Sequence, residues 1–211
     1  MRTSWNELER AHLAQALAVA GPGAPTLCEG WRTEHLAAHV VLRERKPWAV
    51  RGPTFDRTVT EATDRAAYDS LVTIFASTPP VWSPARWAGE PMNLVEYYVH
   101  LQDVLRAGPA DGTRLDPEPA HERALWSQLR LAARLMYRSA QVGVVLEVAG
   151  GPRAVARKPR SGSGSVVVTG RAGELVLHAF GRGAVADVTV EGAPQDVDAL
   201  ARRFPAPPQR A

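Results

Sequence analysis

Three ionisable side chains lie on one side of a predicted helix in the stretch VEYYVHLQDVLRA, residues 95–107. At about 100° per residue, Glu96, His100 and Asp103 share a stripe with apolar residues, which is the pattern of a packed helix face. Burying a carboxylate and an imidazole is unfavourable unless something compensates their polar groups. A divalent cation can do so, because i, i+4 spacing lets one ion contact both Glu96 and His100.

A third ligand is available in GWRTEHLAAHVVLRERKP, residues 30–47, where His39 lies on the apolar stripe of another predicted helix. If the two helices pack side by side, His39 approaches Glu96 and His100. Two imidazoles and one carboxylate leave a coordination position open, as in catalytic zinc sites. Nitrogen and oxygen ligands also suit nickel, cobalt and iron(II), so zinc is the first candidate among several metals.

The same residues also have a structural interpretation. A histidine on an apolar face is often a core residue with a hydrogen-bond partner, and the ExxxH spacing is common by chance. Asp103 either pairs with Arg106 or orients His100 as a carboxylate behind the ligand. Arg43 lies one turn beyond His39 and either anchors an acidic or sugar portion of a substrate or pairs with a carboxylate of the bundle.

The first two thirds of the chain have the pattern of helices joined by loops rich in proline and glycine. Helices are predicted over residues 4–20, 33–45, 59–77, 93–107 and 119–138. After Gln141, short β-branched runs and turn signals predict the order strand, strand, helix, strand, helix. We therefore expect a mainly helical domain over residues 1–140, a small α+β domain over 141–204 and a disordered tail over 205–211.

Composition narrows the classes of protein. The 211 residues are 45% hydrophobic and 22% charged, as in ordinary globular proteins, and the net charge is only +3 with arginines scattered among acids. We therefore expect no nucleic-acid partner. No apolar run approaches a membrane span and no signal-peptide layout is visible, so we expect a cytoplasmic protein without a membrane partner. We expect it to be a monomer or a homodimer. Cys28 is the only cysteine, so an intrachain disulfide is impossible. Because no base is adjacent to it in the sequence, a buried structural thiol is favoured over a reactive one.

Two segments taken together, TLCEGWRTEHLAAHVVLRERKP and NLVEYYVHLQDVLRA, resemble the DinB/YfiT-type metal-binding four-helix bundles. The likeness is to the actinobacterial branch of mycothiol-dependent maleylpyruvate isomerase-like proteins. The segment VVVTGRAGELVLHAFGRG is similar to the small sterol-carrier-like α+β domain that this branch appends. The resemblance spans nearly the whole chain and implies that His39, Glu96 and His100 hold the metal.

The resemblance also implies a reaction. A low-molecular-weight thiol, mycothiol, becomes a nucleophile and adds to an electrophilic small molecule, giving S-transfer or isomerisation. An arginine of the appended domain contributes to the site in that branch, and the candidates here are Arg153, Arg157, Arg171 and Arg182. The alternatives are a non-catalytic protein that binds a metal or an apolar ligand, and a metal-dependent hydrolase. Thiol dependence of the activity separates the hydrolase from the transferase.

Overall fold

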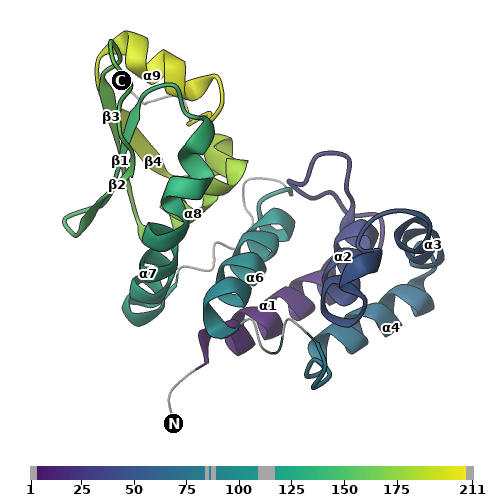
Figure 1. Cartoon of the computed structure of the whole chain (residues 1–211). Coiled ribbons are helices and arrows are strands. Elements are labelled where there is room, and N and C mark those ends of the chain that lie inside the picture. Colours follow the sequence, from purple (N-terminus) through teal and green to yellow (C-terminus); the bar gives the residue numbers. More distant parts are fainter. Residues whose placement is uncertain (1–3, 84–85, 87–88, 109–116, 208–211) are drawn as a thin grey trace. The chain divides into compact units, whose positions relative to one another are not determined.

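The computed structural model describes residues 4–83, 86, 89–108 and 117–207, without the side chains of 89–92. The chain divides into two compact units, Met1–Leu115 and Asp116–Ala211 (Figure 1). The first unit is helical, and the second combines helices with a four-stranded sheet. A mainly helical part followed by a small α+β part is thus confirmed. Among the described residues, no helix is long and apolar enough to cross a bilayer.

The described part of the first unit is mainly helical. Its α-helices are α1 (Trp5–Ala20), α2 (Thr33–Arg45), α3 (Pro53–Glu61), α4 (Arg65–Ala76) and α6 (Gly89–Leu105), and the 3₁₀ turn η1 (Pro47–Ala49) follows α2. Helix α1 packs against α4 and α6, while α2 packs against α3 and α4. The predicted bounds of the 33–45 helix are confirmed. Pro47 limits this helix, because proline disfavours helical geometry in the residue before it.

The single helix expected over residues 59–77 is wrong, since two helices, α3 and α4, meet there. Asp64 is the reason: its side chain accepts hydrogen bonds from the N–H groups of Ala66 and Ala67, both at 3.0 Å. An aspartate that caps the first turn begins a new helix at the next residue. Apolar residues at helical spacing on both sides of Asp64 made the segment resemble a single helix.

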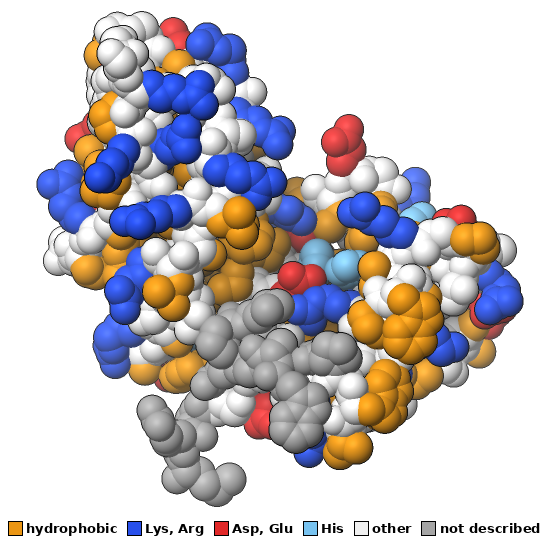
Figure 2. All heavy atoms as spheres, viewed as in Figure 1, with side chains coloured by type: hydrophobic (Ala, Val, Ile, Leu, Met, Phe, Trp, Pro, Cys, Tyr) orange, Lys and Arg blue, Asp and Glu red, His pale blue; other side chains and the backbone are white. Residues whose placement is uncertain are grey.

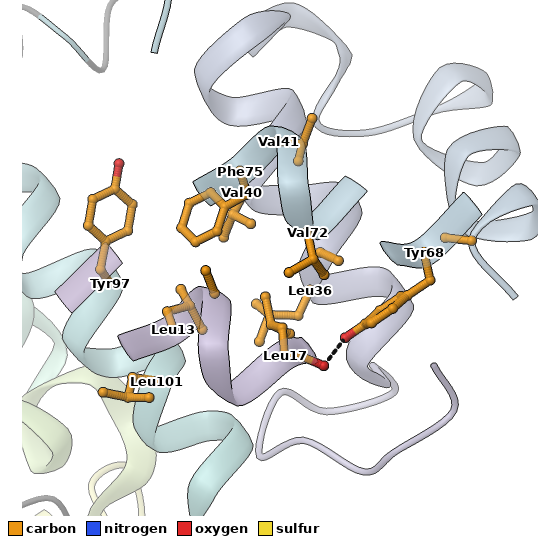
Figure 3. Packing of buried hydrophobic residues seen from close by; sticks show 13 residues of the cluster. Leu13, Leu17, Leu36, Val40, Val41, Tyr68, Val72, Phe75, Tyr97 and Leu101 are labelled. Carbon is orange, nitrogen blue, oxygen red and sulfur yellow. Dashed lines mark hydrogen bonds between the residues drawn. The ribbon is translucent and has the colours of Figure 1, made fainter. Parts of the chain in front are cut away.

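The core of the first unit lies between α1, α2, α4 and α6 (Figure 3). Its buried side chains include Leu13, Leu17, Leu36, Val40, Tyr68, Val72, Phe75, Tyr97 and Leu101. The hydroxyl of Tyr68 donates to the carbonyl of Leu17 at 2.9 Å, so this buried phenol has a partner on α1. Close packing of these helices fixes which faces of α2 and α6 remain available for a site.

A buried ion pair joins three helices of this unit. Arg10 of α1 donates to both carboxylate oxygens of Glu44 on α2, at 3.0 and 2.6 Å. Arg10 also donates to the hydroxyl of Tyr97 on α6 at 2.8 Å, and that hydroxyl donates to Glu44 at 2.6 Å. Bidentate pairs of this kind fix both distance and orientation. Helices α2 and α6 are therefore held to each other both directly, by Tyr97 and Glu44, and through Arg10 of α1.

The second unit begins with α7 (Pro119–Met136) and η2 (Tyr137–Ser139). Its remaining elements are β1 (Gly143–Val148), β2 (Arg153–Arg157), β3 (Ser165–Gly170), α8 (Ala172–Leu177), the turns η3 (His178–Arg182) and η4 (Gly183–Val185), β4 (Val188–Glu191) and α9 (Pro194–Ala201). The strand order is β2-β1-β3-β4, with β1 and β3 parallel and the outer pairs antiparallel. One face is buried through Val144, Leu146, Val166, Val168 and Val190. Helix α8 packs on β1 and β3, and α9 packs on β3.

One strand of the second unit differs from expectation. Strand β2, with the sequence RAVAR, was not predicted because its alanines and arginines lack a strong strand pattern. Helix α7 packs on α8 and β2, so by contacts it groups with the sheet. The expected boundary at residue 140 lies between η2 and β1 and stays a prediction. Of the tail expected to be disordered, residues 208–211 lie outside the described part of the chain.

Candidate metal centre

The three predicted ligands come together in the first unit. His39 Nε2 and His100 Nε2 each lie 3.3 Å from the same oxygen, Oε1 of Glu96. One ligand atom from each residue lies within 4.8 Å of the other two. Glu96 and His100 are one turn apart on α6, and His39 faces them from α2. The structure thus brings together all three candidates, while their role as metal ligands stays a prediction.

The buried pair described above positions this group. Glu44 lies five residues beyond His39 on α2, and Tyr97 directly follows Glu96 on α6. Because the hydroxyl of Tyr97 donates to Glu44, the two ligand-bearing helices are tied together close to the site. The aromatic ring of Trp31 lies 5.2 Å from the ring of His39, measured between centroids, and forms an apolar wall beside it.

The site is partly open. The side chains of His39, Glu96 and His100 are 19%, 27% and 11% exposed. On the face shown in Figure 2, histidine side chains reach the surface beside acidic and basic side chains. Side chains with this degree of exposure can exchange a small ligand with solvent.

The pKa values of Glu96 and His100 are both shifted in favour of the charged forms. Burial acts to raise its pKa, but hydrogen bonds with His100 and His39 and the charges of His100 and Arg43 lower the pKa well below its usual range. For His100, burial acts to lower the pKa, yet hydrogen bonds with Asp103, Cys28 and Glu96 raise it well above the ordinary value. Without a metal, the site therefore holds a carboxylate facing a protonated imidazole. A cation that binds here must displace that proton.

The other side of His100 faces the interior. Its Nδ1 lies 3.0 Å from Oδ2 of Asp103, a fully buried carboxylate, and the thiol of Cys28 donates to the same oxygen at 3.1 Å. Of the two roles considered for Asp103, contact with His100 is thus present, whereas Arg106 donates to Gln102 at 2.6 Å. When a cation displaces the proton on Nε2, the proton held on Nδ1 leaves the lone pair of Nε2 available on the side of Glu96. This is the tautomer that an Nε2 metal ligand requires.

Cys28, His100 and Asp103 also meet the distance criterion for a metal group, with ligand atoms within 4.8 Å of one another. The chemistry of this set favours a hydrogen-bond chain, because the thiol and the imidazole both donate to one carboxylate. The set that includes His39 and Glu96 is the more open of the two and remains the better cation site.

Arg43 lies at the edge of the centre. Its Nε is 3.4 Å from Oε1 of Glu96, and its Nη1 donates to the side-chain oxygen of Asn93 at 3.1 Å. Of the two roles considered for Arg43, pairing with a carboxylate is therefore observed, and the carboxylate belongs to the candidate site itself. The contact with Asn93 was not predicted. Its position three residues before Glu96, on the same side of α6, is the signal that could have found it.

Three of the four arginines considered in the second unit contact residues of that same unit. Arg153 pairs with Glu147 at 2.6 Å, and Arg171 lies 3.3 Å from Glu122. Arg182 donates to the carbonyl of Phe180 at 2.7 Å. Arg157 ends strand β2. Their assignment to the site stays a prediction.

Comparison with known proteins places the fold. A scan against protein-family models and a search of curated proteins gave no match. Among solved structures, the chain shares its class of fold, a helical part followed by a small α+β part, with an enzyme. That structure is the mycothiol-dependent maleylpyruvate isomerase, with a TM-score of 0.56 and 21% identity over 90% of this chain and 92% of that chain. A histidine-to-alanine mutant of the isomerase matches with a TM-score of 0.55 and 20% identity over the same shares.

Proposed function

We propose that this chain is a metal-dependent isomerase or S-transferase that uses a low-molecular-weight thiol, mycothiol, against a small electrophilic molecule. The observation that carries the proposal is the convergence of His39 Nε2, His100 Nε2 and Glu96 Oε1. The shared fold with a mycothiol-dependent isomerase supports the thiol as co-substrate. In this proposal, α1, α2, α4 and α6 are the four helices of a DinB-like bundle.

The donor set fits a divalent cation. Ligand atoms about 2.0 to 2.1 Å from a tetrahedral zinc ion lie about 3.3 Å from one another. Both nitrogens lie 3.3 Å from Oε1 of Glu96, so these two distances match that spacing, and all three ligand atoms lie within 4.8 Å of one another. Two imidazoles and a carboxylate suit zinc, and also nickel, cobalt or iron(II). Three protein ligands leave a position for an exogenous molecule, as in catalytic sites.

When bound, the cation would lower the pKa of a coordinated thiol, so that its sulfur is anionic at neutral pH. The chain's own residues prepare this chemistry. Asp103 holds the proton on Nδ1 of His100 and thereby keeps Nε2 available. Trp31 shields His39 on one side. Arg43 adds positive charge at the rim, where it can anchor an acidic or sugar portion of a substrate.

Thiol consumption in the presence and absence of metal tests the proposal. Purified protein is loaded with zinc and incubated with mycothiol and a panel of electrophiles, and loss of free thiol and product formation are followed together. His39→Ala and His100→Ala are compared with His12→Ala, which removes a histidine of α1 outside the site. We expect turnover in the wild type and in His12→Ala, and its loss in the other two variants.

Other outcomes separate the alternatives. Turnover of an ester or amide that does not require thiol would identify a metal-dependent hydrolase, since water would then take the open position. Stoichiometric metal binding without turnover of any electrophile would identify a non-catalytic binder. Equal thiol consumption by metal-free and zinc-loaded protein would contradict the proposed role of the centre.

A further inference from the structure

The second unit has a cavity of its own. Its volume is about 380 Å³, and all of its lining residues belong to Asp116–Ala211. It lies beside the first turns of α7, the end of β1 and the start of α8. At about 30 Å³ per water molecule, this space corresponds to roughly a dozen waters. Ligand pockets in proteins typically begin near this size.

The walls of the cavity are apolar. Trp126 of α7, Val148 at the end of β1 and Pro152 in the turn after it contribute hydrocarbon surface. An indole presents a large apolar area at small entropic cost, which makes it a common anchor for apolar ligands. An apolar molecule that covers these walls removes apolar surface from water, which is favourable.

The charges at the cavity favour an anion. Glu122 is already neutralised: its Oε1 lies 3.3 Å from Arg171, and its Oε2 accepts from the N–H of Gly173 at 3.2 Å. Arg123, the other cation of the lining, is exposed and forms no ion pair with any residue that the structure describes. One carboxylate and two guanidiniums leave the cavity with a net charge of about +1 at neutral pH.

We propose that this cavity binds a small apolar molecule that carries a single carboxylate. The apolar body lies against Trp126, and the carboxylate lies at the rim, where Arg123 is available to pair with it. The ligand contains about a dozen non-hydrogen atoms, from the volume of the cavity. A ligand with two or more charges is excluded by the apolar walls, because only the rim supplies compensation.

The test uses the full chain after removal of metal, so that its result is independent of the proposed thiol chemistry. Binding is measured by titration calorimetry with decanoate and with 2-naphthoate, which are an aliphatic and an aromatic molecule with one carboxylate each. Decanamide serves as the neutral counterpart of decanoate. We expect saturable binding of at least one of the two acids with one site per chain. Binding of decanamide should be about fivefold weaker than that of decanoate, the upper range for an exposed ion pair.

Three variants locate the site. Ala149→Phe places a ring in the cavity from an exposed position and should abolish binding. Arg123→Gln should weaken binding of the acid about fivefold while leaving decanamide unchanged. Arg130→Gln is the matched control, because Arg130 is an exposed arginine of α7 that does not line the cavity.

Several results would overturn the proposal. They are an absence of saturable binding for both acids, equal affinities for decanoate and decanamide, or binding that survives Ala149→Phe. Circular dichroism of Ala149→Phe must match that of the wild type; if it does not, the decision rests on Arg123→Gln against Arg130→Gln.

Discussion

Replacing Asp103 with asparagine should weaken metal binding without unfolding the protein. Asp103 is fully buried, and its Oδ2 lies 3.0 Å from Nδ1 of His100 and 3.1 Å from the thiol of Cys28. Asn has nearly the same shape, so the packing around it is preserved. The amide, however, is neutral and can turn either its oxygen or its NH₂ group toward the imidazole. The proton of His100 is then no longer fixed on Nδ1.

The size of the effect follows from this contact. Loss of a carboxylate behind a histidine ligand typically costs about 10- to 100-fold in metal affinity. At 1.36 kcal/mol per tenfold change, this corresponds to about 1.4 to 2.7 kcal/mol. Because Asp103 is fully buried and contacts His100 at 3.0 Å, we expect the upper half of this range. The variant Cys28→Ser, which retains a donor to Asp103, should change affinity less than about threefold.

Competition with a fluorescent zinc chelator measures the affinity, and urea unfolding of the metal-free proteins reports their stability. The expected pattern is a large loss of affinity in Asp103→Asn, little loss in Cys28→Ser, and similar unfolding midpoints. An Asp103→Asn protein that binds zinc as tightly as the wild type would refute the reasoning. So would an affinity loss matched by an equal loss of stability, since the effect would then be one of folding.

Three further predictions concern stability and pH. Arg10→Met leaves the carboxylate of Glu44 buried without its cationic partner and should lower the free energy of unfolding by about 3 to 5 kcal/mol in urea titrations. The matched change Arg65→Met, at an exposed ion pair, should leave the free energy of unfolding nearly unchanged. Burial lowers the pKa of His178 to about 4, so its stabilising contribution is complete above about pH 6.5 and is lost as the pH falls toward 4. Thermal unfolding of wild type between pH 7 and 4 should show this loss, and His178→Leu should show a flatter profile. Because the pKa of His100 is raised, zinc binding at neutral pH should release a proton, which calorimetry in buffers of different ionisation enthalpy detects; buffer-independent enthalpies would contradict it.

The sequence was informative where a signal is local. Glu96 and His100 were selected as candidate ligands from their spacing on one helix, and the bounds of α2 followed from a regular apolar period that ends before a proline. His39 could be chosen because it is the histidine on the apolar stripe of that helix. These features depend on neighbours within a few turns, which a single sequence displays.

Contacts between segments that are distant in the sequence could not be predicted. Arg10 and Glu44 are 34 residues apart, and nothing in either helix indicates that they meet. Their pairing depends on how three helices pack, and that packing depends on the whole core. The contact of Cys28 with Asp103, separated by 75 residues, was missed for the same reason. Strand β2 was not predicted because it has few β-branched residues. A short edge strand can form without them when its neighbour supplies the hydrogen bonds.

The most direct test of the metal centre is a crystal of the zinc-loaded protein examined by anomalous scattering at the zinc edge. We predict one strong anomalous peak bonded to Nε2 of His39, Nε2 of His100 and a carboxylate oxygen of Glu96, at about 2.0 to 2.2 Å from each. A zinc-loaded protein with no peak between these three side chains, or with its zinc bound elsewhere, would contradict the account.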